Sequence, residues 1–239
     1  LSFMEMILYA IAAICCFLTG MYLLLLLLYR YGWRRHAIYT APPGYQPAVM
    51  ISIIVPARNE AGNLPACLSS LLAQQYPRHL FEIIVVDDHS EDDTAAVAEG
   101  FHDSRIRCIR LADHLAPGVQ VTAYKKQALA AGIAQSSGEL IITTDADCIA
   151  PTDWLHIMAA CYEEHRPVMI AAPVDFTSNG SLVQVFQSLD FMSMQGITVA
   201  AHQLKLGGMS NGANLAFSRE AYYKIGGYAG TEHLASGDD

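Results

Sequence analysis

Two aspartates, Asp145 and Asp147, follow an apolar stretch at residues 140–144 and are separated by a single residue. In an extended strand the side chains alternate between two faces, so residues i and i+2 project to the same side. Carboxylates placed in this way repel each other unless a cation lies between them. Mg²⁺ and Mn²⁺ prefer oxygen ligands and often bind one or two carboxylates together with substrate phosphates. The pair therefore predicts a divalent metal site, with an ordinary polar loop as the alternative for any isolated Asp-x-Asp.

Strands and helices alternate on both sides of this pair. Apolar stretches typical of strands lie at residues 50–55, 83–86, 106–111, 140–144 and 168–172. Helical patterns lie between them at residues 64–73, 94–101, 125–134 and 154–164. This alternation predicts an α/β fold, in which βαβ units build a mostly parallel sheet with helices on both faces. Ligands of such sheets bind at the carboxyl ends of the strands.

Polar clusters follow three of the predicted strands, at residues 56–60, 87–90 and 145–147. All three should lie at the same edge of a parallel sheet. The sequence contains no Gly-x-Gly-x-x-Gly and no Gly-x₄-Gly-Lys-Ser/Thr segment, so the usual glycine-rich phosphate loops are absent. A metal ion is then the natural way to hold phosphates at this edge.

The N-terminal segment predicts a membrane anchor. Hydrophobic residues make up 53% of the 239 residues, and their excess lies here, because no residue from 6 to 28 is charged. At about 1.5 Å per residue, a helix of this length spans roughly 35 Å, which is enough to cross a bilayer. A signal peptide is the alternative, but Glu5 before the segment and the basic and aromatic residues at 29–35 favour an uncleaved anchor. Those basic residues predict that the rest of the chain is cytoplasmic, at an inner or plasma membrane.

We therefore expect residues 1–35 to form a single transmembrane anchor with a basic juxtamembrane segment, residues 36–49 a linker, and residues 50–239 one α/β domain. The net charge of −9, with no basic stripe beyond the anchor, excludes nucleic acid as a partner. The six cysteines show no CxxC spacing, which predicts reduced thiols rather than a zinc site or a disulfide framework.

Five motifs occur in order: SIIVPARNE (52–60), EIIVVDDHSEDDT (82–94), TDADC (144–148), GANLAFSRE (212–220) and GDD (237–239). In their order and spacing, residues 50–239 resemble the family 2 glycosyltransferases. The resemblance implies a GT-A fold, a nucleotide-diphospho-sugar donor with UDP favoured, a Mn²⁺ or Mg²⁺ ion, and inversion at the anomeric carbon. It implies transfer of a hexosyl or N-acetylhexosaminyl group to a carbohydrate or lipid-linked acceptor, as in polysaccharide or glycolipid biosynthesis.

The resemblance also assigns donor-binding residues by their place in the motifs. Pro56, Arg58 and Glu60 would line the nucleoside pocket. Asp88 would hydrogen-bond the uracil or ribose, because a carboxylate accepts from a base N–H or from sugar hydroxyls. Asp87 fits a turn-capping role instead.

Asp147 would be the direct metal ligand, and Asp145 would face the ribose or the metal. Lys125 would contact a phosphate or the sugar, and a solvated helix charge is an equally good interpretation of this lysine. Ala130 stands where the family usually has an asparagine, so an asparagine contact at this position is not expected.

Gly212 and Asn214 would lie on the acceptor side. Asp239 corresponds to the family's general base, with Asp238 in the position before it. A hydroxyl acceptor is a weak nucleophile, and a positioned carboxylate contributes about 10²–10⁴-fold to its attack. Because family members continue beyond this motif, we expect the glycosyltransferase domain to be C-terminally incomplete in this chain.

Two further interpretations remain open. Residues 181–206 are weakly charged and rich in Met, Gln and Phe, which predicts a long helix, with burial slightly favoured over lipid contact.

The rival function is a non-catalytic, membrane-anchored protein that binds a nucleotide sugar or a partner through a degenerate GT-A domain. The intact aspartates favour the enzyme. A nucleotidyltransferase would share the sheet and the metal but usually shows an N-terminal glycine-rich loop.

Overall fold

The computed structural model describes residues 2–114, 123–177 and 180–230. The chain forms two compact units. The first combines the N-terminal segment up to Ile38 with the segment Asp175–Met209, and the second combines Tyr39–Val174 with the segment from Ser210 onward. Residues 175–209 thus group with the N-terminal helix in the structure, and the bounds predicted for the glycosyltransferase domain, residues 50–239, stay a prediction.

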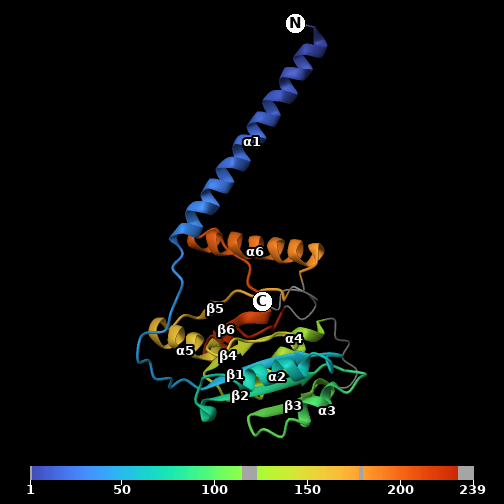
Figure 1. Cartoon of the computed structure of the whole chain (residues 1–239), viewed down its shortest axis with the longest axis vertical. Coiled ribbons are helices and arrows are strands. Elements are labelled where there is room, and N and C mark those ends of the chain that lie inside the picture. The colour runs from blue at the N-terminus through green and yellow to red at the C-terminus, as the bar shows by residue number, and fades with distance from the viewer. Residues whose placement is uncertain (1, 115–122, 178–179, 231–239) are drawn as a thin grey trace. The chain divides into compact units, whose positions relative to one another are not determined.

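The second unit is built on a six-stranded sheet with the order β3-β2-β1-β4-β6-β5 (Figure 1). The strands are β1 (Ile51–Ala57), β2 (Phe81–Asp87), β3 (Ile106–Arg110), β4 (Leu140–Thr143), β5 (Met169–Ala171) and β6 (Leu215–Ser218). The first four strands are parallel, with Ile53 opposite Ile83 and Ile51 opposite Leu140, whereas β6 runs antiparallel to both β4 and β5. The mixed, mostly parallel sheet confirms the predicted α/β fold class. The strand β6 was not among the predicted strands.

Helices cover both faces of this sheet because the central strands are apolar on both sides. On one face, α2 (Leu64–Leu72), α3 (Thr94–Glu99) and α5 (Trp154–His165) pack on alternate residues of β1, including Ile53 and Val55. On the other face, α4 (Tyr124–Ala134) packs against Ile54. Short elements complete the unit: η1 (Arg78–Leu80), η2 (Leu111–His114), η3 (Gly212–Asn214) and α7 (Arg219–Lys224).

A partly buried acid, Glu82, joins the amino ends of the three central strands. One carboxylate oxygen accepts hydrogen bonds from the Ser52 hydroxyl and from both the backbone N–H and the hydroxyl of Ser137, each at 2.7 Å. The other oxygen lies 3.0 Å from the Arg107 guanidinium. Burial raises the pKa of Glu82, but these hydrogen bonds and the Arg107 charge outweigh it, so the pKa lies below its ordinary value. Glu82 is therefore ionised at neutral pH.

The first unit consists of α1 (Phe3–Arg35) and α6 (Leu182–Gln203). Ser2 and Glu5 form a capping box at the start of α1, each side chain accepting from the other residue's backbone N–H. Among the described residues, α1 is the one helix long and apolar enough to cross a membrane, judged by length and composition alone. The prediction of a long helix at 181–206 is confirmed, but its predicted burial is wrong. Ala200 is the buried residue of α6, because α6 packs beside the end of α1 and joins neither core cluster of the sheet.

Candidate active site

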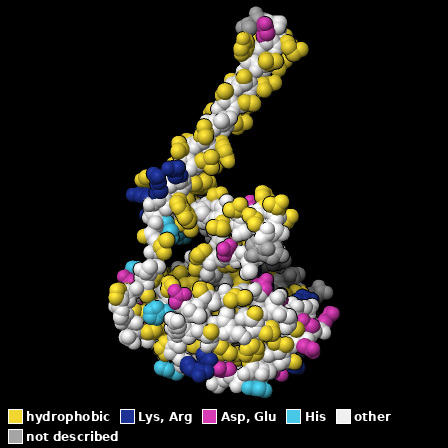
Figure 2. Space-filling view, viewed as in Figure 1, with side chains coloured by type: hydrophobic (Ala, Val, Ile, Leu, Met, Phe, Trp, Pro, Cys, Tyr) yellow, Lys and Arg dark blue, Asp and Glu magenta, His cyan; other side chains and the backbone are white. Residues whose placement is uncertain are grey.

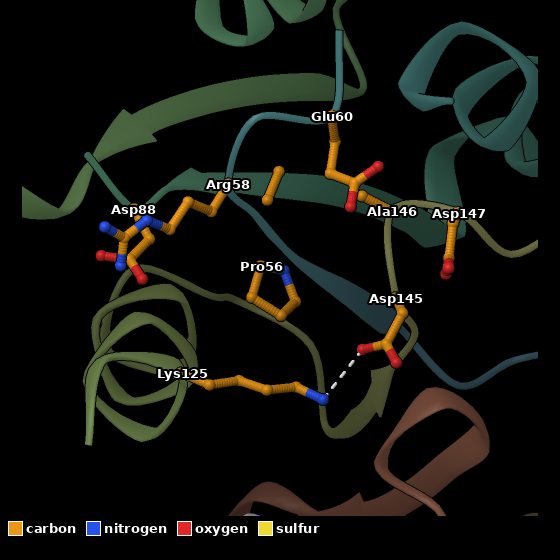
Figure 3. A pocket seen from close by; sticks show the side chains of 9 residues that line it. Pro56, Arg58, Glu60, Asp88, Lys125, Asp145, Ala146 and Asp147 are labelled. Atoms are coloured by element: carbon orange, nitrogen blue, oxygen red, sulfur yellow. Dashed lines mark ion pairs between the residues drawn. The ribbon is translucent and has the colours of Figure 1, made fainter. Parts of the chain in front are cut away.

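The loops that follow β1, β2 and β4 form one pocket with the first turn of α4 at the carboxyl edge of the sheet (Figure 3). The cavity measures about 250 Å³. Its lining consists of Pro56, Ala57, Arg58, Glu60, Asp88, Lys125, Asp145, Ala146 and Asp147. Every residue that the sequence assigned to the donor or to the metal therefore lies at this one place.

Asp145 and Asp147 reach the pocket from a turn and not from a strand. β4 ends at Thr143, so the argument from strand alternation does not apply to this pair. Ala146, between the two aspartates, is buried in the core and fixes the turn, and the Cys148 N–H donates to the Asp145 carbonyl at 3.1 Å. With the alanine buried, the two flanking carboxylates both line the pocket.

Lys125 extends from the first turn of α4 to Asp145, as Figure 3 shows. Its ammonium nitrogen lies 3.0 Å from Asp145 Oδ1. Both side chains are more than one-third exposed, so the ion pair adds little to the stability of the fold. The ion pair matters for binding, because it places a cation beside Asp145, one of the two candidate metal ligands.

Asp88 is a buried acid at the opposite end of the pocket from Asp147. Its Oδ1 lies 2.9 Å from His89 Nδ1, and its backbone N–H donates to the Ala57 carbonyl at 2.8 Å. Asp87 behaves as the sequence suggested, because its carboxylate accepts from the Ser90 N–H at 3.3 Å and closes the turn. Of these two neighbours, Asp88 therefore lines the pocket and Asp87 stabilises the turn.

Two residues that contact the pocket lining from outside it, His89 and Tyr124, were not predicted from the sequence. The His89 ring meets the Tyr124 ring edge-on, with centroids 5.6 Å apart, and the Arg58 guanidinium lies over the same tyrosine at 5.6 Å. His89 has a φ of 54°, an uncommon value for a residue other than glycine. A signal for Tyr124 was available, since it is the aromatic residue directly before Lys125.

Hydrogen bonds fix the loops after β1 and β2 to each other. The Asn59 N–H donates to the Ser90 hydroxyl at 3.0 Å, and the Glu91 N–H donates to the Asn59 side chain at 2.8 Å. The Glu60 N–H donates to the Thr94 hydroxyl at 2.8 Å. The pocket wall is thus held by contacts that need no ligand, as a preorganised site requires.

The remaining predicted residues lie elsewhere. Gly212 and Asn214 do not line the pocket, although they sit close behind β4 in η3. The Gly212 carbonyl accepts from the Thr143 hydroxyl at 2.6 Å, and the Asn214 amide bridges the Trp154 indole and the Pro173 carbonyl. Their acceptor-side role stays a prediction. Asp238 and Asp239, the predicted base and its neighbour, lie outside the described residues.

The donor atoms of the pocket fit a hard divalent ion. Across the described part of the chain, no three His, Cys, Asp or Glu side chains come together in a ready-made metal site. Mg²⁺ and Mn²⁺ need no such cage, since one or two carboxylates with phosphate and water oxygens complete their coordination. The nearby thiol of Cys148 has a raised pKa, because it is partly buried and lies beside Asp147 and Asp145. Cys148 does not line the pocket, so the candidate metal ligands there are carboxylate oxygens.

An open, mostly parallel sheet with one antiparallel strand and a pocket at its carboxyl edge places the protein in the GT-A class of α/β folds. Residues 52–226 match the model of glycosyl transferase family 2, and the chain belongs to that family.

Similar proteins agree with this assignment. Glycosyltransferase AglE of Haloferax volcanii is 26% identical over 191 residues, which cover 79% of this chain and 58% of AglE. The undecaprenyl-phosphate 4-deoxy-4-formamido-L-arabinose transferase of Pseudomonas savastanoi is 31% identical over 125 residues, covering 52% of this chain and 35% of that protein.

Among solved structures, the mannosyltransferase PcManGT from Pyrobaculum calidifontis, in complex with GDP-Man and Mn²⁺, superposes with a TM-score of 0.65 at 25% identity. The match covers 90% of this chain and 58% of PcManGT. This chain thus spans little more than half the length of AglE and of PcManGT.

Proposed function

We propose that the protein is a membrane-anchored glycosyltransferase that moves a sugar from a nucleotide-diphospho-sugar to a hydroxyl acceptor with the help of a divalent ion. The observation that carries this proposal is the pocket itself. It combines a buried carboxylate at one end, a lysine in the middle and two carboxylates on one turn. Family membership and the likeness to a structure that holds GDP-Man and Mn²⁺ support it.

The nucleoside would bind between the loops after β1 and β2. Asp88 would accept a hydrogen bond from a base N–H or a ribose hydroxyl, while His89 fixes its carboxylate. Arg58 and Tyr124 supply a cationic and aromatic surface beside it. UDP is the nucleotide that the sequence favours, and GDP is the one in the PcManGT structure, so a test needs both.

The diphosphate would lie toward Lys125 and the turn at 145–147. Asp145 and Asp147 would hold the divalent ion, which when bound neutralises the charge that develops on the leaving diphosphate. Lys125 would turn from Asp145 to a phosphate oxygen, because both are anions within reach of its flexible side chain. The donor's negative charge would then be met by the Lys125 ammonium and by the divalent ion that the two carboxylates hold.

Transfer would follow direct displacement. The acceptor oxygen would attack the anomeric carbon while the bond between that carbon and the diphosphate oxygen breaks. The proton of the acceptor hydroxyl would pass to a carboxylate. By motif position that base is Asp239, with Asp238 before it. The base and the leaving group would lie on opposite faces of the sugar, so the configuration at the anomeric carbon would invert.

Membrane anchoring rests on α1. Its apolar length and its basic, aromatic C-terminal end fit a single span with the catalytic unit on the cytoplasmic side of an inner or plasma membrane. An anchored enzyme works where lipid-linked sugars are concentrated. The Pseudomonas relative is named for a transfer involving undecaprenyl-phosphate, and this favours a lipid-linked acceptor over a soluble carbohydrate.

The test is turnover by the full chain in vesicles, measured as release of UDP or GDP from a panel of nucleotide sugars, with and without Mn²⁺ and candidate acceptors. We expect metal-dependent release from one donor class and an inverted anomer in the product. Asp147→Asn should lower the rate by about 10²-fold or more. Asp239→Asn should lower it by about 10²–10⁴-fold, and Asp238→Asn by far less.

A matched control is Asp153→Asn, which changes an exposed aspartate outside the pocket and should leave the rate unchanged. Release that ignores both the metal and Asp147→Asn would contradict the proposal. Tight donor binding by the complete protein, with no release under any condition, would instead support the non-catalytic alternative.

A further inference from the structure

α6 exposes large apolar side chains along its length. Leu182 is 89% exposed, Phe186 70% and Leu189 59%, and Val183, Met192 and Ile197 are exposed as well. Figure 2 shows hydrophobic side chains over this helix as well as along α1. Soluble proteins rarely leave a continuous apolar patch of this kind in water, and such patches mark contact with a partner or a membrane.

These side chains gather on one side of the helix. At 3.6 residues per turn, Leu182, Phe186, Leu189 and Ile197 fall within one broad arc. The opposite side carries Gln184, Ser188, Gln195 and His202. Asp190, the single acidic residue of α6, lies on the apolar side between Ile197 and Val183, Ser193 lies near the centre of this side, and the helix contains no lysine or arginine.

The polar side of α6 has its own neighbours in the segment that precedes the helix. The Ser188 hydroxyl donates to the Asp175 carboxylate at 3.3 Å. Phe191, a large apolar residue on this side, packs on Phe176 with ring centroids 4.7 Å apart. The apolar side is therefore the one that needs a partner.

The apolar side faces the C-terminal end of α1, since Ala200 lies on the same arc as Leu182. Ala200 packs directly on Gly32, where an added Cβ would come within 2.5 Å of the Ala200 carbonyl oxygen. The Trp33 ring lies beside Gly196, also on this arc. Figure 1 shows α6 running across this end of α1. The contact falls about 6 Å past Leu28, where the uncharged stretch ends, and thus at the level of lipid headgroups.

We propose that α6 is an interfacial helix, which lies in the surface of the bilayer that α1 crosses and buries its apolar side among the lipids. The proposal rests on the membrane anchoring proposed above. Helices with one apolar and one polar side insert about 5–10 Å into the boundary between headgroups and acyl chains. Since α6 lacks basic residues, attraction to anionic lipids comes from the arginines at the end of α1, and α6 itself binds by its apolar area.

The proposal can be tested by quenching of tryptophan fluorescence with brominated phospholipids, using the full chain reconstituted in vesicles. Phe186→Trp and Ile197→Trp place the probe on the apolar side. His202→Trp is the matched control, because it is exposed and lies about 160° around the helix axis from position 186. The parent chain supplies the background from Trp33 and from Trp154, which is buried.

We expect quenching at positions 186 and 197 to exceed that at position 202 by roughly twofold or more, as an insertion depth of 5–10 Å implies. Equal quenching at all three positions would overturn the proposal. So would a probe at 186 that is shielded from both brominated lipid and aqueous iodide, since that pattern means coverage by protein, such as a second copy.

The natural Trp33 distinguishes failure of the membrane anchor from failure of the interfacial role of α6. If it is quenched in the parent chain while positions 186 and 197 behave like position 202, the anchor stands and the role of α6 is wrong. If Trp33 itself is not quenched, both the anchor and the interfacial helix are wrong.

Discussion

At the scale of single residues, the ion pair between Lys125 and Asp145 is the contact most open to change when a ligand binds. An ammonium 3.0 Å from a candidate metal ligand competes with a divalent ion for the same oxygen. A bound diphosphate offers the lysine another anion. The pair should therefore weaken metal binding in the absence of nucleotide and strengthen nucleotide binding in the presence of the metal.

Lys125→Met tests this expectation. We expect the variant to bind Mn²⁺ several-fold more tightly without nucleotide, and to bind the nucleotide diphosphate about tenfold more weakly, as loss of a charged hydrogen bond implies. Isothermal titration measures both constants. Lys224→Met, at an exposed lysine of α7, is the control. Equal changes of the same sign in both constants would contradict the competition.

His89 is expected to position Asp88 rather than to contact the reacting atoms. His89→Ala removes the partner of Asp88 Oδ1 and should weaken nucleotide binding about tenfold. His89→Asn should restore most of the affinity, because asparagine can donate to the carboxylate and tolerates positive φ.

His102 provides the control for backbone strain, since it also has a positive φ of 48° and lies outside the pocket. His102→Ala should lower stability without changing the nucleotide dissociation constant. If the alanine and asparagine variants of His89 bind nucleotide equally, the positioning role is wrong.

The sequence predicted which residues line the pocket, but it did not predict the local structure that brings them together. Motif position identified Arg58, Asp88, Lys125 and the two aspartates of the turn, and all of them line one cavity. The turn that presents the aspartates depends on burial of Ala146, which strand periodicity does not reveal. Tyr124 and its ring contacts arise from where α4 begins relative to β2, and this is a matter of packing in three dimensions.

At the scale of elements, Glu82 joins the amino ends of β1, β2 and the segment before β4. Its pKa is below the ordinary value, so its ionised form stabilises the folded state above the pKa of the unfolded chain. This stabilisation is lost as the pH falls through the folded pKa. Glu82→Gln should therefore lower the free energy of unfolding by about 1–3 kcal/mol at pH 7.

The difference between the parent and Glu82→Gln should shrink in acid, because protonation removes the same charge from the parent. Denaturant unfolding at several pH values, followed by the fluorescence of buried Trp154, measures it. Glu91→Gln, at an exposed glutamate, is the control. A difference that is constant from neutral to acidic pH would show that the ionised form of Glu82 is not the source of the stability.

The sequence predicted the parallel strands well, because β1, β2 and β4 are apolar and buried on both faces. It did less well for β6, whose four residues pair antiparallel with β4 and give little periodic signal. For α6 it predicted a helix but the wrong environment. An apolar helix gives the same sequence pattern whether it is buried or exposed, and only packing in three dimensions, such as that of Ala200 on Gly32, separates the two cases.

At the scale of the whole molecule, the chain separates a unit suited to a membrane from a unit suited to soluble chemistry. α1 and α6 carry the exposed apolar surface, and the sheet unit carries the pocket. A linear reading of the sequence assigned α6 to the catalytic domain, since it lies between strands of one sheet along the chain. Contacts between residues distant in sequence, such as Gly32 and Ala200, were beyond that reading.

The measurement that tests the central claim most directly is the Mn²⁺ electron paramagnetic resonance signal during titration of the full chain with UDP and with GDP. One nucleotide should convert free Mn²⁺ to the bound form in the parent and in Asp153→Asn. Asp145→Asn combined with Asp147→Asn should leave the ion free at the same concentrations. If the doubly substituted chain bound Mn²⁺ and nucleotide as tightly as the parent, the two carboxylates would not be the metal site.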